Sequence, residues 1–237
     1  PADITGTNIL NLKENSFTLR KGPLFSQVVL GDEINRAPAK TQSALLEAMQ
    51  ESQVTIEGST ESLPSPFIVL ATQNPIEQEG VYALPEAQVD RFTFRLKLGY
   101  PDFEQERMVL NTYNEPVQAV AQVLGASDIL ALSDQAEKVH IAPALLDYIV
   151  SLVQETRSHM FVLLGASPRA SLALMSCAKV RALLKGRDHV LPDDLKALAH
   201  PVLCHRLILT PEAELDRVPV SEIVDDILSR VPYAKGG

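Results

Sequence analysis

The first hundred residues alternate between short apolar runs and polar breaks, a pattern that predicts a parallel sheet. Residues 28–30 and 67–71 are apolar without polar alternation, which is typical of strands buried on both faces. Residues 92–98 alternate apolar and polar side chains and predict a third strand. A helix is expected between the first two strands, because Pro38 suits a first helical turn and apolar residues follow it at helical spacing. The pattern therefore indicates an α/β fold.

Shorter segments around these strands predict further local elements. Residues 16–20 alternate and favour a strand. Residues 53–57 alternate as well, and the turn at Gly58-Ser59 with a return arm toward Leu63 predicts a β-hairpin. A short helix is expected at residues 85–89.

Helical periodicity replaces this pattern beyond Pro101, where we place a domain boundary. The two predicted domains are an α/β core at residues 1–100 and a helical domain at residues 101–237. The segment 116–125, rich in Ala, Val and Gln, is typical of a linker. The expected helices cover residues 103–114, 127–139, a stretch that starts at Pro143, and residues 168–184, 192–207 and 220–231.

Composition and charge narrow the class of protein. The formal net charge is -9 and no block rich in Lys and Arg is present, which disfavours a nucleic-acid-binding surface. No apolar run approaches the ~20 residues of a membrane span, and no secretory signal is visible. Cys177 and Cys204 are isolated, so a reducing cytoplasm is the expected compartment.

Candidate chemistry begins at Asp32 and Glu33, which directly follow the first buried strand. In open α/β sheets, ligands bind at the carboxyl ends of the strands. Two adjacent carboxylates can divide two tasks there, since one can hold a hydrated Mg²⁺ while the other orients or deprotonates a water. This arrangement resembles the Walker B element of P-loop NTPases. The alternative is an acidic N-cap on the next helix.

Three further side chains could complete a phosphate site. Asn74 ends the second buried strand and could hold a water, or it is a turn residue ahead of Pro75. Arg91 precedes the third strand and could reach a phosphate of a neighbouring subunit, or it forms a surface ion pair with Asp90. Arg169 stands in the first turn of a helix, where its charge opposes the helix dipole; it is functional or simply exposed.

Other reactive side chains give weaker indications. The hydroxyl residues, Thr72 among them, have no nucleophilic context, and no GxSxG motif is present. His200 and Cys204 could share one helix face and bind a metal, but no third or fourth ligand is evident.

Four motifs resemble the MoxR family of AAA+ ATPases, and weaker similarity continues through most of the chain. The motifs are residues 31–38 (GDEINRAP), 42–51 (QSALLEAMQE), 71–80 (ATQNPIEQEG) and 84–92 (LPEAQVDRF). The resemblance implies a P-loop NTPase-type parallel sheet followed by a carboxyl-terminal helical lid. It also implies that residues 9–20 are an insert in helix 2 and that residues 53–63 are the hairpin before sensor 1.

The resemblance implies a role for each candidate residue. Asp32 would coordinate Mg²⁺ and Glu33 would activate the attacking water. Asn74 would be sensor 1. Arg91 would be the arginine finger offered to the ATP of the next subunit, and Arg169 would be sensor 2, touching the γ-phosphate.

One expected motif is missing, because no glycine of the chain begins a GxxxxGK[ST] sequence. In the family this phosphate-binding loop lies upstream of the position that matches Pro1. The strand that leads into it lies between the strands of Phe67 and Phe92, so the sheet would lack its central strand. The 237-residue chain is therefore expected not to bind ATP tightly and to be inactive as an ATPase.

The resemblance implies an ATP-hydrolysing, chaperone-like remodelling machine in the prokaryotic cytoplasm. It would form a homo-oligomeric ring, expected to be a hexamer, and assist the maturation of partner complexes or the insertion of metal cofactors. A protein with a von Willebrand factor A domain would be a partner. The alternatives are a nucleic-acid motor or loader of a related AAA+ branch, or a non-catalytic interaction module if Pro1 is the native start.

Overall fold

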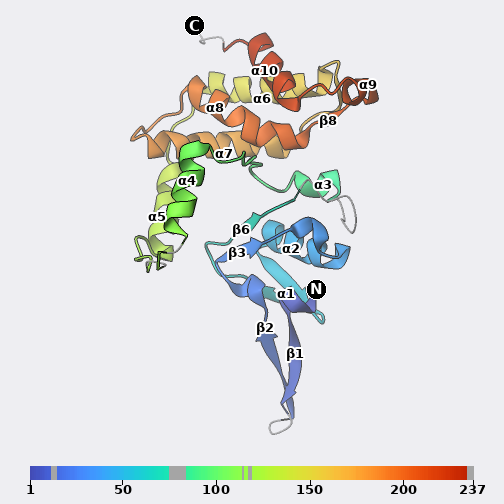
Figure 1. The fold of residues 1–237 in the computed structure, drawn as a ribbon, viewed down its shortest axis with the longest axis vertical. Coiled ribbons are helices and arrows are strands. Elements are labelled where there is room, and N and C mark those ends of the chain that lie inside the picture. The colour runs from blue at the N-terminus through green and yellow to red at the C-terminus, as the bar shows by residue number, and fades with distance from the viewer. Residues whose placement is uncertain (12–14, 75–83, 114, 117–118, 234–237) are drawn as a thin grey trace.

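A computed structural model describes residues 1–11, 15–74, 84–113, 115–116 and 119–233. The elements fall into an amino-terminal α/β group and a carboxyl-terminal helical group, joined by the chain around α3 (Figure 1). Each group has its own hydrophobic core. Buried residues between Leu24 and Leu63 form the first core, and buried residues between Val139 and Ile227 form the second.

The centre of the amino-terminal group is a pair of parallel strands. Strand β3 (Val28–Gly31) pairs with β6 (Ile68–Ala71), with Val28 opposite Ile68 and Gly31 opposite Ala71. Helix α2 (Ala39–Glu51) lies between them in the sequence and supplies Leu45 and Ala48 to the first core. The predicted parallel arrangement of these two strands is confirmed. It places the residues after β3 and after β6 at the same end of the pair.

Two antiparallel hairpins accompany this pair. Strands β1 (Gly6–Asn11) and β2 (Ser16–Lys21) form a hairpin that projects away from the rest of the molecule (Figure 1). Strands β4 (Gln53–Ile56) and β5 (Ser59–Ser62) form the second hairpin, which was predicted at residues 53–63. The remaining short elements are α1 (Ala2–Thr5), α3 (Glu86–Val89) and the 3-10 turns η1 (Pro23–Phe25) and η2 (Ile34–Arg36).

The predicted strand at residues 92–98 is wrong, because these residues form no regular element. A strand needs a neighbour for its backbone groups, and none of the described strands pairs with this segment. Instead the backbone N–H of Arg95 donates to the carbonyl oxygen of Pro201 at 3.0 Å. Apolar side chains of the segment are consequently exposed, with Leu98 97% accessible.

The predicted burial of both faces of the parallel strands is also wrong. On one face Val29 and Val69 pack against the first core. On the other face the side chains are open to solvent, with Val28 61% and Leu70 52% exposed. The apolar runs were correctly assigned to strands, but in this chain no described element covers their second face.

The carboxyl-terminal group is helical, as predicted. Helix α7 lies at the centre of the second core, where Ala170, Leu174, Ala178 and Ala182 are buried. Helix α8 ends at Leu203 and continues as the turn η3, so it is shorter than the predicted 192–207. The helices are α4 (Phe103–Thr112), α5 (Ala126–Glu137), α6 (Pro143–Ser158), α7 (Pro168–Leu184), α8 (Pro192–Leu203), α9 (Pro211–Leu215) and α10 (Val220–Arg230), with η3 (Cys204–Arg206) and strands β7 (Val162–Leu164) and β8 (Ile208–Leu209). Among the described residues, none of the helices has the length and apolar content to cross a membrane.

Candidate functional site

The predicted acidic pair lies at the carboxyl end of β3, beside the residues that follow β6. Thr72 connects the two acids. Its hydroxyl donates to Oδ1 of Asp32 at 2.6 Å and accepts the backbone N–H of Glu33 at 2.8 Å. The carbonyl oxygen of Thr72 also accepts the N–H of Ile34 at 3.0 Å. A single threonine therefore fixes the carboxylate of Asp32 and the backbone of Glu33 together.

Glu33 adopts an unusual backbone conformation, with φ 47° and ψ 50° in the left-handed region. A non-glycine residue there costs about 1–2 kcal/mol. The surrounding hydrogen bonds maintain this conformation, and a strained residue held in place by its neighbours is typical of a functional site. The carboxylate of Glu33 forms an ion pair with Arg36 at 3.0 Å and remains partly exposed. The acid is therefore oriented and accessible, and the N-cap alternative is unsupported because Glu33 makes no side-chain cap bond to the following turn.

Asn74 lies at the same end of the parallel strands. Its carbonyl oxygen accepts the side-chain N–H of the buried Asn35 at 3.3 Å. Gln42, also buried, donates to the carbonyl oxygen of Ile34 at 3.1 Å. These two amides connect the loop after β3, the loop after β6 and helix α2. The structure thus gathers Asp32, Glu33 and Asn74 at one edge, which we call the acidic edge.

The two predicted arginines lie together at a different place. Arg91 and Arg169 line one pocket of about 180 Å³ with Met49 and Gln50, at the carboxyl end of α2. We call this the arginine pocket. Arg91 Nη1 donates to the carbonyl oxygen of Leu46 at 3.2 Å, and its Nε is buried without a hydrogen-bond partner in the described chain. A cation is favoured at this end of a helix by the helix dipole.

The acidic edge and the arginine pocket are separated by the length of α2. Glu33 precedes the helix, whereas Met49 and Gln50 belong to its last turn. The helix has 13 residues, which corresponds to about 20 Å at 1.5 Å per residue. The two sets of predicted site residues therefore do not form one site within this chain.

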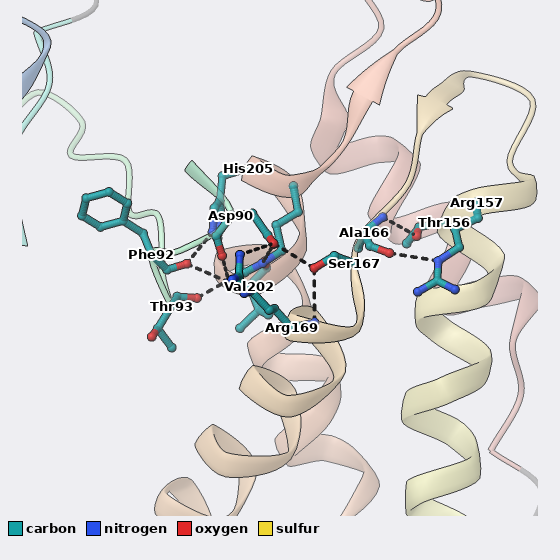
Figure 2. Close-up of polar contacts among 11 residues, drawn as sticks. Asp90, Phe92, Thr93, Thr156, Arg157, Ala166, Ser167, Arg169, Val202 and His205 are labelled. Carbon is teal, nitrogen blue, oxygen red and sulfur yellow. Dashed lines mark hydrogen bonds and ion pairs between the residues drawn. The ribbon is translucent and has the colours of Figure 1, made fainter. Parts of the chain in front are cut away.

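The alternative assigned to Arg91, an ion pair with Asp90, is wrong. The carboxylate of Asp90 instead binds Arg206 Nε at 2.9 Å and the hydroxyl of Ser167 at 2.8 Å (Figure 2). Arg169 approaches the same carboxylate at 3.7 Å while its side chain is 48% exposed. Asp90 is therefore the connection between the segment that carries Arg91 and the helices that follow Pro101.

Hydrogen bonds of the loop before helix α7 fix the position of Arg169. Ser167 is the N-cap of α7, and its side chain accepts the backbone N–H of Arg169 at 3.2 Å. Immediately before it, Ala166 is buried between two residues of α6 (Figure 2). Its N–H donates to the hydroxyl of Thr156 at 3.0 Å, and its carbonyl oxygen accepts Arg157 Nε at 2.9 Å.

Sequence reasoning missed His205 and Arg206, which follow α8 and are both only 8% exposed. His205 Nε2 donates to the carbonyl oxygen of Phe92 at 2.9 Å. Burial and the charge of Arg206 lower the pKa of His205 from 6.5 to about 4, so its imidazole is neutral near pH 7. The only signal in the sequence was that two adjacent polar residues interrupt the otherwise apolar stretch at the end of the predicted helix.

The weak indication of a metal site at His200 and Cys204 finds no support in the structure. His200 Nε2 binds Asp225 at 2.8 Å, and its other nitrogen lies 3.8 Å from the sulfur of Cys204. The imidazole is therefore already occupied on both sides. Burial raises the pKa of Cys204, which disfavours the thiolate that a metal needs. Within the described residues no group of three or more His, Cys, Asp or Glu could hold a metal ion.

Comparison with known proteins identifies the family of the two parts of the chain. The model of an "ATPase family associated with various cellular activities (AAA)" matches residues 1–94, and that of an "AAA lid domain" matches residues 154–227. The uncharacterized protein YeaC of Bacillus subtilis is 47% identical over 98% of this chain and 73% of its own length. Chaperone MoxR1 of Mycobacterium tuberculosis is 44% identical over 98% of this chain, which spans 64% of that protein.

A solved structure gives the same result. The crystal structure of a candidate ATPase from Cytophaga hutchinsonii superposes with a TM-score of 0.92 at 44% identity, covering 99% of this chain and 74% of that one. The fold is thus the mixed α/β AAA+ fold with a carboxyl-terminal helical lid. On its motifs, its fold and its relatives, this chain belongs to the MoxR family of AAA+ ATPases.

Proposed function

We propose that the full-length protein hydrolyses ATP at the contact between two subunits. The observation that supports this is the separation of the acidic edge from the arginine pocket by about 20 Å, the length of α2. Neither set can reach the other's ligand within one chain. In a ring, however, the acidic edge of one subunit can face the arginine pocket of the next, because head-to-tail contacts bring different surfaces together.

The acidic edge suits a hydrated magnesium ion. Mg²⁺ is usually bound by one or two carboxylates together with substrate phosphates and waters. Asp32 is exposed, and the hydrogen bond from Thr72 orients its carboxylate, so Asp32 would hold the ion. Mg²⁺ would neutralise charge that develops on the phosphate oxygens.

The remaining residues would divide the work of hydrolysis. Glu33, oriented by its ion pair with Arg36, would accept a proton from the attacking water. The side-chain amide of Asn74 would position that water against the terminal phosphate. From the adjacent subunit, Arg91 would stabilise the charge of the transition state, and Arg169 would contact the same phosphate because it lines the same pocket.

Subunit mixing tests this arrangement. Glu33→Gln should keep ATP binding and lower kcat by about 100-fold or more, since it removes the general base. Arg91→Ala should lower kcat to a similar extent by removing the arginine finger. Equal mixtures of the two variants should recover activity, because a subunit with an intact Glu33 then meets a neighbour with an intact Arg91.

One outcome of the mixing experiment would overturn the proposal. If the mixture is no more active than its components, although native mass spectrometry shows mixed rings, Arg91 does not act across the contact. Arg187→Lys serves as a matched control, since Arg187 binds Asp194 inside the lid and touches neither set of residues.

We further propose that hydrolysis drives a chaperone-like action on a partner complex in a bacterial cytoplasm. The projecting β1–β2 hairpin would contact the client, because its Phe17 is 72% exposed. A metal inserted during maturation would bind to the client. We also propose that the protein forms a hexameric ring and that a von Willebrand factor A-domain protein is its partner. Pull-down of such a partner with the full-length protein, lost on deletion of residues 7–20, tests it.

A further inference from the structure

We propose that Arg206 is a positioning residue that couples the lid to the arginine finger. The inference rests on the proposed role of Arg91 and extends it by naming what holds Arg91 in place. Arg206 itself would touch neither ATP nor water. It would act by fixing the backbone on both sides of Arg91.

The guanidinium of Arg206 binds the chain immediately before and after Arg91. Before it, Nε and Nη2 donate to the carboxylate and the carbonyl oxygen of Asp90 at 2.9 and 3.2 Å. After it, Nη2 donates to the carbonyl oxygen of Phe92 at 2.7 Å and Nη1 donates to that of Thr93 at 3.3 Å. Asp90 and Phe92, the sequence neighbours of Arg91, are both anchored in this way (Figure 2).

The other end of this connection lies in the lid. Arg206 follows α8 directly, and its Nη1 also donates to the carbonyl oxygen of Val202 in that helix. Val202 and Leu203 are fully buried in the second core. The neighbouring His205 adds a second donor to the carbonyl oxygen of Phe92. A displacement of α8 must therefore move the segment that carries Arg91.

The buried position of Arg206 argues that this connection is specific. The side chain is 3% exposed, and burying a guanidinium is unfavourable unless its donors are satisfied. The planar fork of arginine satisfies several carbonyl oxygens and a carboxylate at once. A lysine at this position would keep the charge opposite Asp90 but cannot reach all of these acceptors.

Arg206→Lys in the full-length protein tests the inference. Misplacement of a catalytic group by about 1 Å can cost up to about 100-fold, so we expect kcat to fall by about 10- to 100-fold with unchanged ATP affinity. Mixing with Glu33→Gln subunits should then restore activity, because those subunits supply a correctly held Arg91 to the intact acidic edge of the Arg206→Lys subunits.

A merely structural role would give a different pattern. If the substitution only impaired the folding of its own subunit, the Arg206→Lys subunits would stay inactive in the mixture, and the inference would be overturned. It would also be overturned if Arg187→Lys, which alters a partly buried arginine–aspartate contact inside the lid, lowered kcat to the same extent. An active mixture of Glu33→Gln with Arg91→Ala, measured in parallel, shows whether a failure concerns Arg206 alone or the proposed function.

Asp90→Asn provides a second route if Arg206→Lys does not fold. The amide keeps an oxygen that can accept from Arg206 but removes the charge of the pair. We expect a smaller loss of kcat that the same mixing experiment restores. A variant that folds and retains the full kcat would contradict the inference.

Discussion

Thr72 illustrates how much one hydroxyl can determine at the acidic edge. It lies between the carboxylate of Asp32 and the backbone of Glu33 and hydrogen-bonds to both. From the sequence it was one of several hydroxyl residues without a nucleophilic context. Nothing in the sequence indicated this role, because Thr72 lies about 40 residues after the two acids and meets them only through the pairing of β3 with β6.

Replacement of Thr72 by valine keeps the shape of the side chain and removes the hydroxyl. A hydrogen bond to a charged group contributes about 1.5–3 kcal/mol, so we expect kcat of the full-length protein to fall by about tenfold or more. Thr72→Ser retains the hydroxyl and should remain close to wild type. Equal turnover of the valine and serine variants would show that Thr72 does not orient the acids.

His205 should make the stability of the protein sensitive to acid. Its pKa is lowered to about 4 from 6.5, so the unfolded chain binds a proton more readily than the folded one, and stability is lost as the pH falls from 6.5 toward 4. The full effect is on the order of 3 kcal/mol. Arg206, Arg95 and Asp90 are the charged groups that act on this imidazole.

His205→Gln tests this pH dependence by thermal unfolding. The glutamine amide can still donate to the carbonyl oxygen of Phe92, but it does not titrate. The variant should lose less stability than the wild type between pH 6.5 and pH 4.5. If the two proteins lost the same amount of stability between pH 6.5 and pH 4.5, His205 would not be the cause of the acid sensitivity.

At the scale of elements, hydrophobic patterns identified most helices and strands but did not show whether each predicted strand has a partner to pair with. The parallel pair, the hairpin at 53–63 and the lid helices were predicted correctly because each pattern reflects a local period. Residues 92–98 have the same quality of alternation and yet form no strand, since no described strand offers them backbone partners. Arg206 was missed for a related reason, because a charged residue at a helix end is usually solvated.

The N-terminus of α7 performs two tasks through Ser167, and this can be measured. Its hydroxyl caps the helix and also donates to Asp90. Loss of a cap costs about 1 kcal/mol, and loss of the second bond should add about 1 kcal/mol more. Ser167→Ala should therefore lower the free energy of unfolding more than Thr210→Ala, which removes only the cap of α9. Chemical denaturation that gives equal losses would contradict the second task.

At the scale of the whole molecule, the family motifs carried the identification, and the arrangement of the site came from the structure. The four motifs indicated Asp32, Glu33, Asn74 and Arg91, and the weaker similarity beyond them indicated Arg169, but the sequence did not show which of these residues share a site. Folding separates the arginines from the acids by the length of α2. The domain boundary near Pro101 stays a prediction.

The 237-residue chain should not bind ATP with micromolar affinity. It has no GxxxxGK[ST] loop to surround the phosphates, and the acidic edge by itself would repel a polyphosphate. Isothermal titration with MgATP should therefore give no saturable heat at micromolar protein, whereas a full-length relative serves as the positive control. A micromolar dissociation constant for the chain alone would refute this expectation.

The exposed apolar face of the β3–β6 pair should affect such a titration, because it favours self-association of the chain. Its apolar side chains lie beside strand edges for which the described chain offers no partner, and such an edge is a template for another copy. The net charge of -9 opposes this association, but added salt screens the repulsion. Dilute, low-salt samples should consequently be monodisperse, while concentrated or high-salt samples should scatter light and release heat of dilution that mimics a ligand signal.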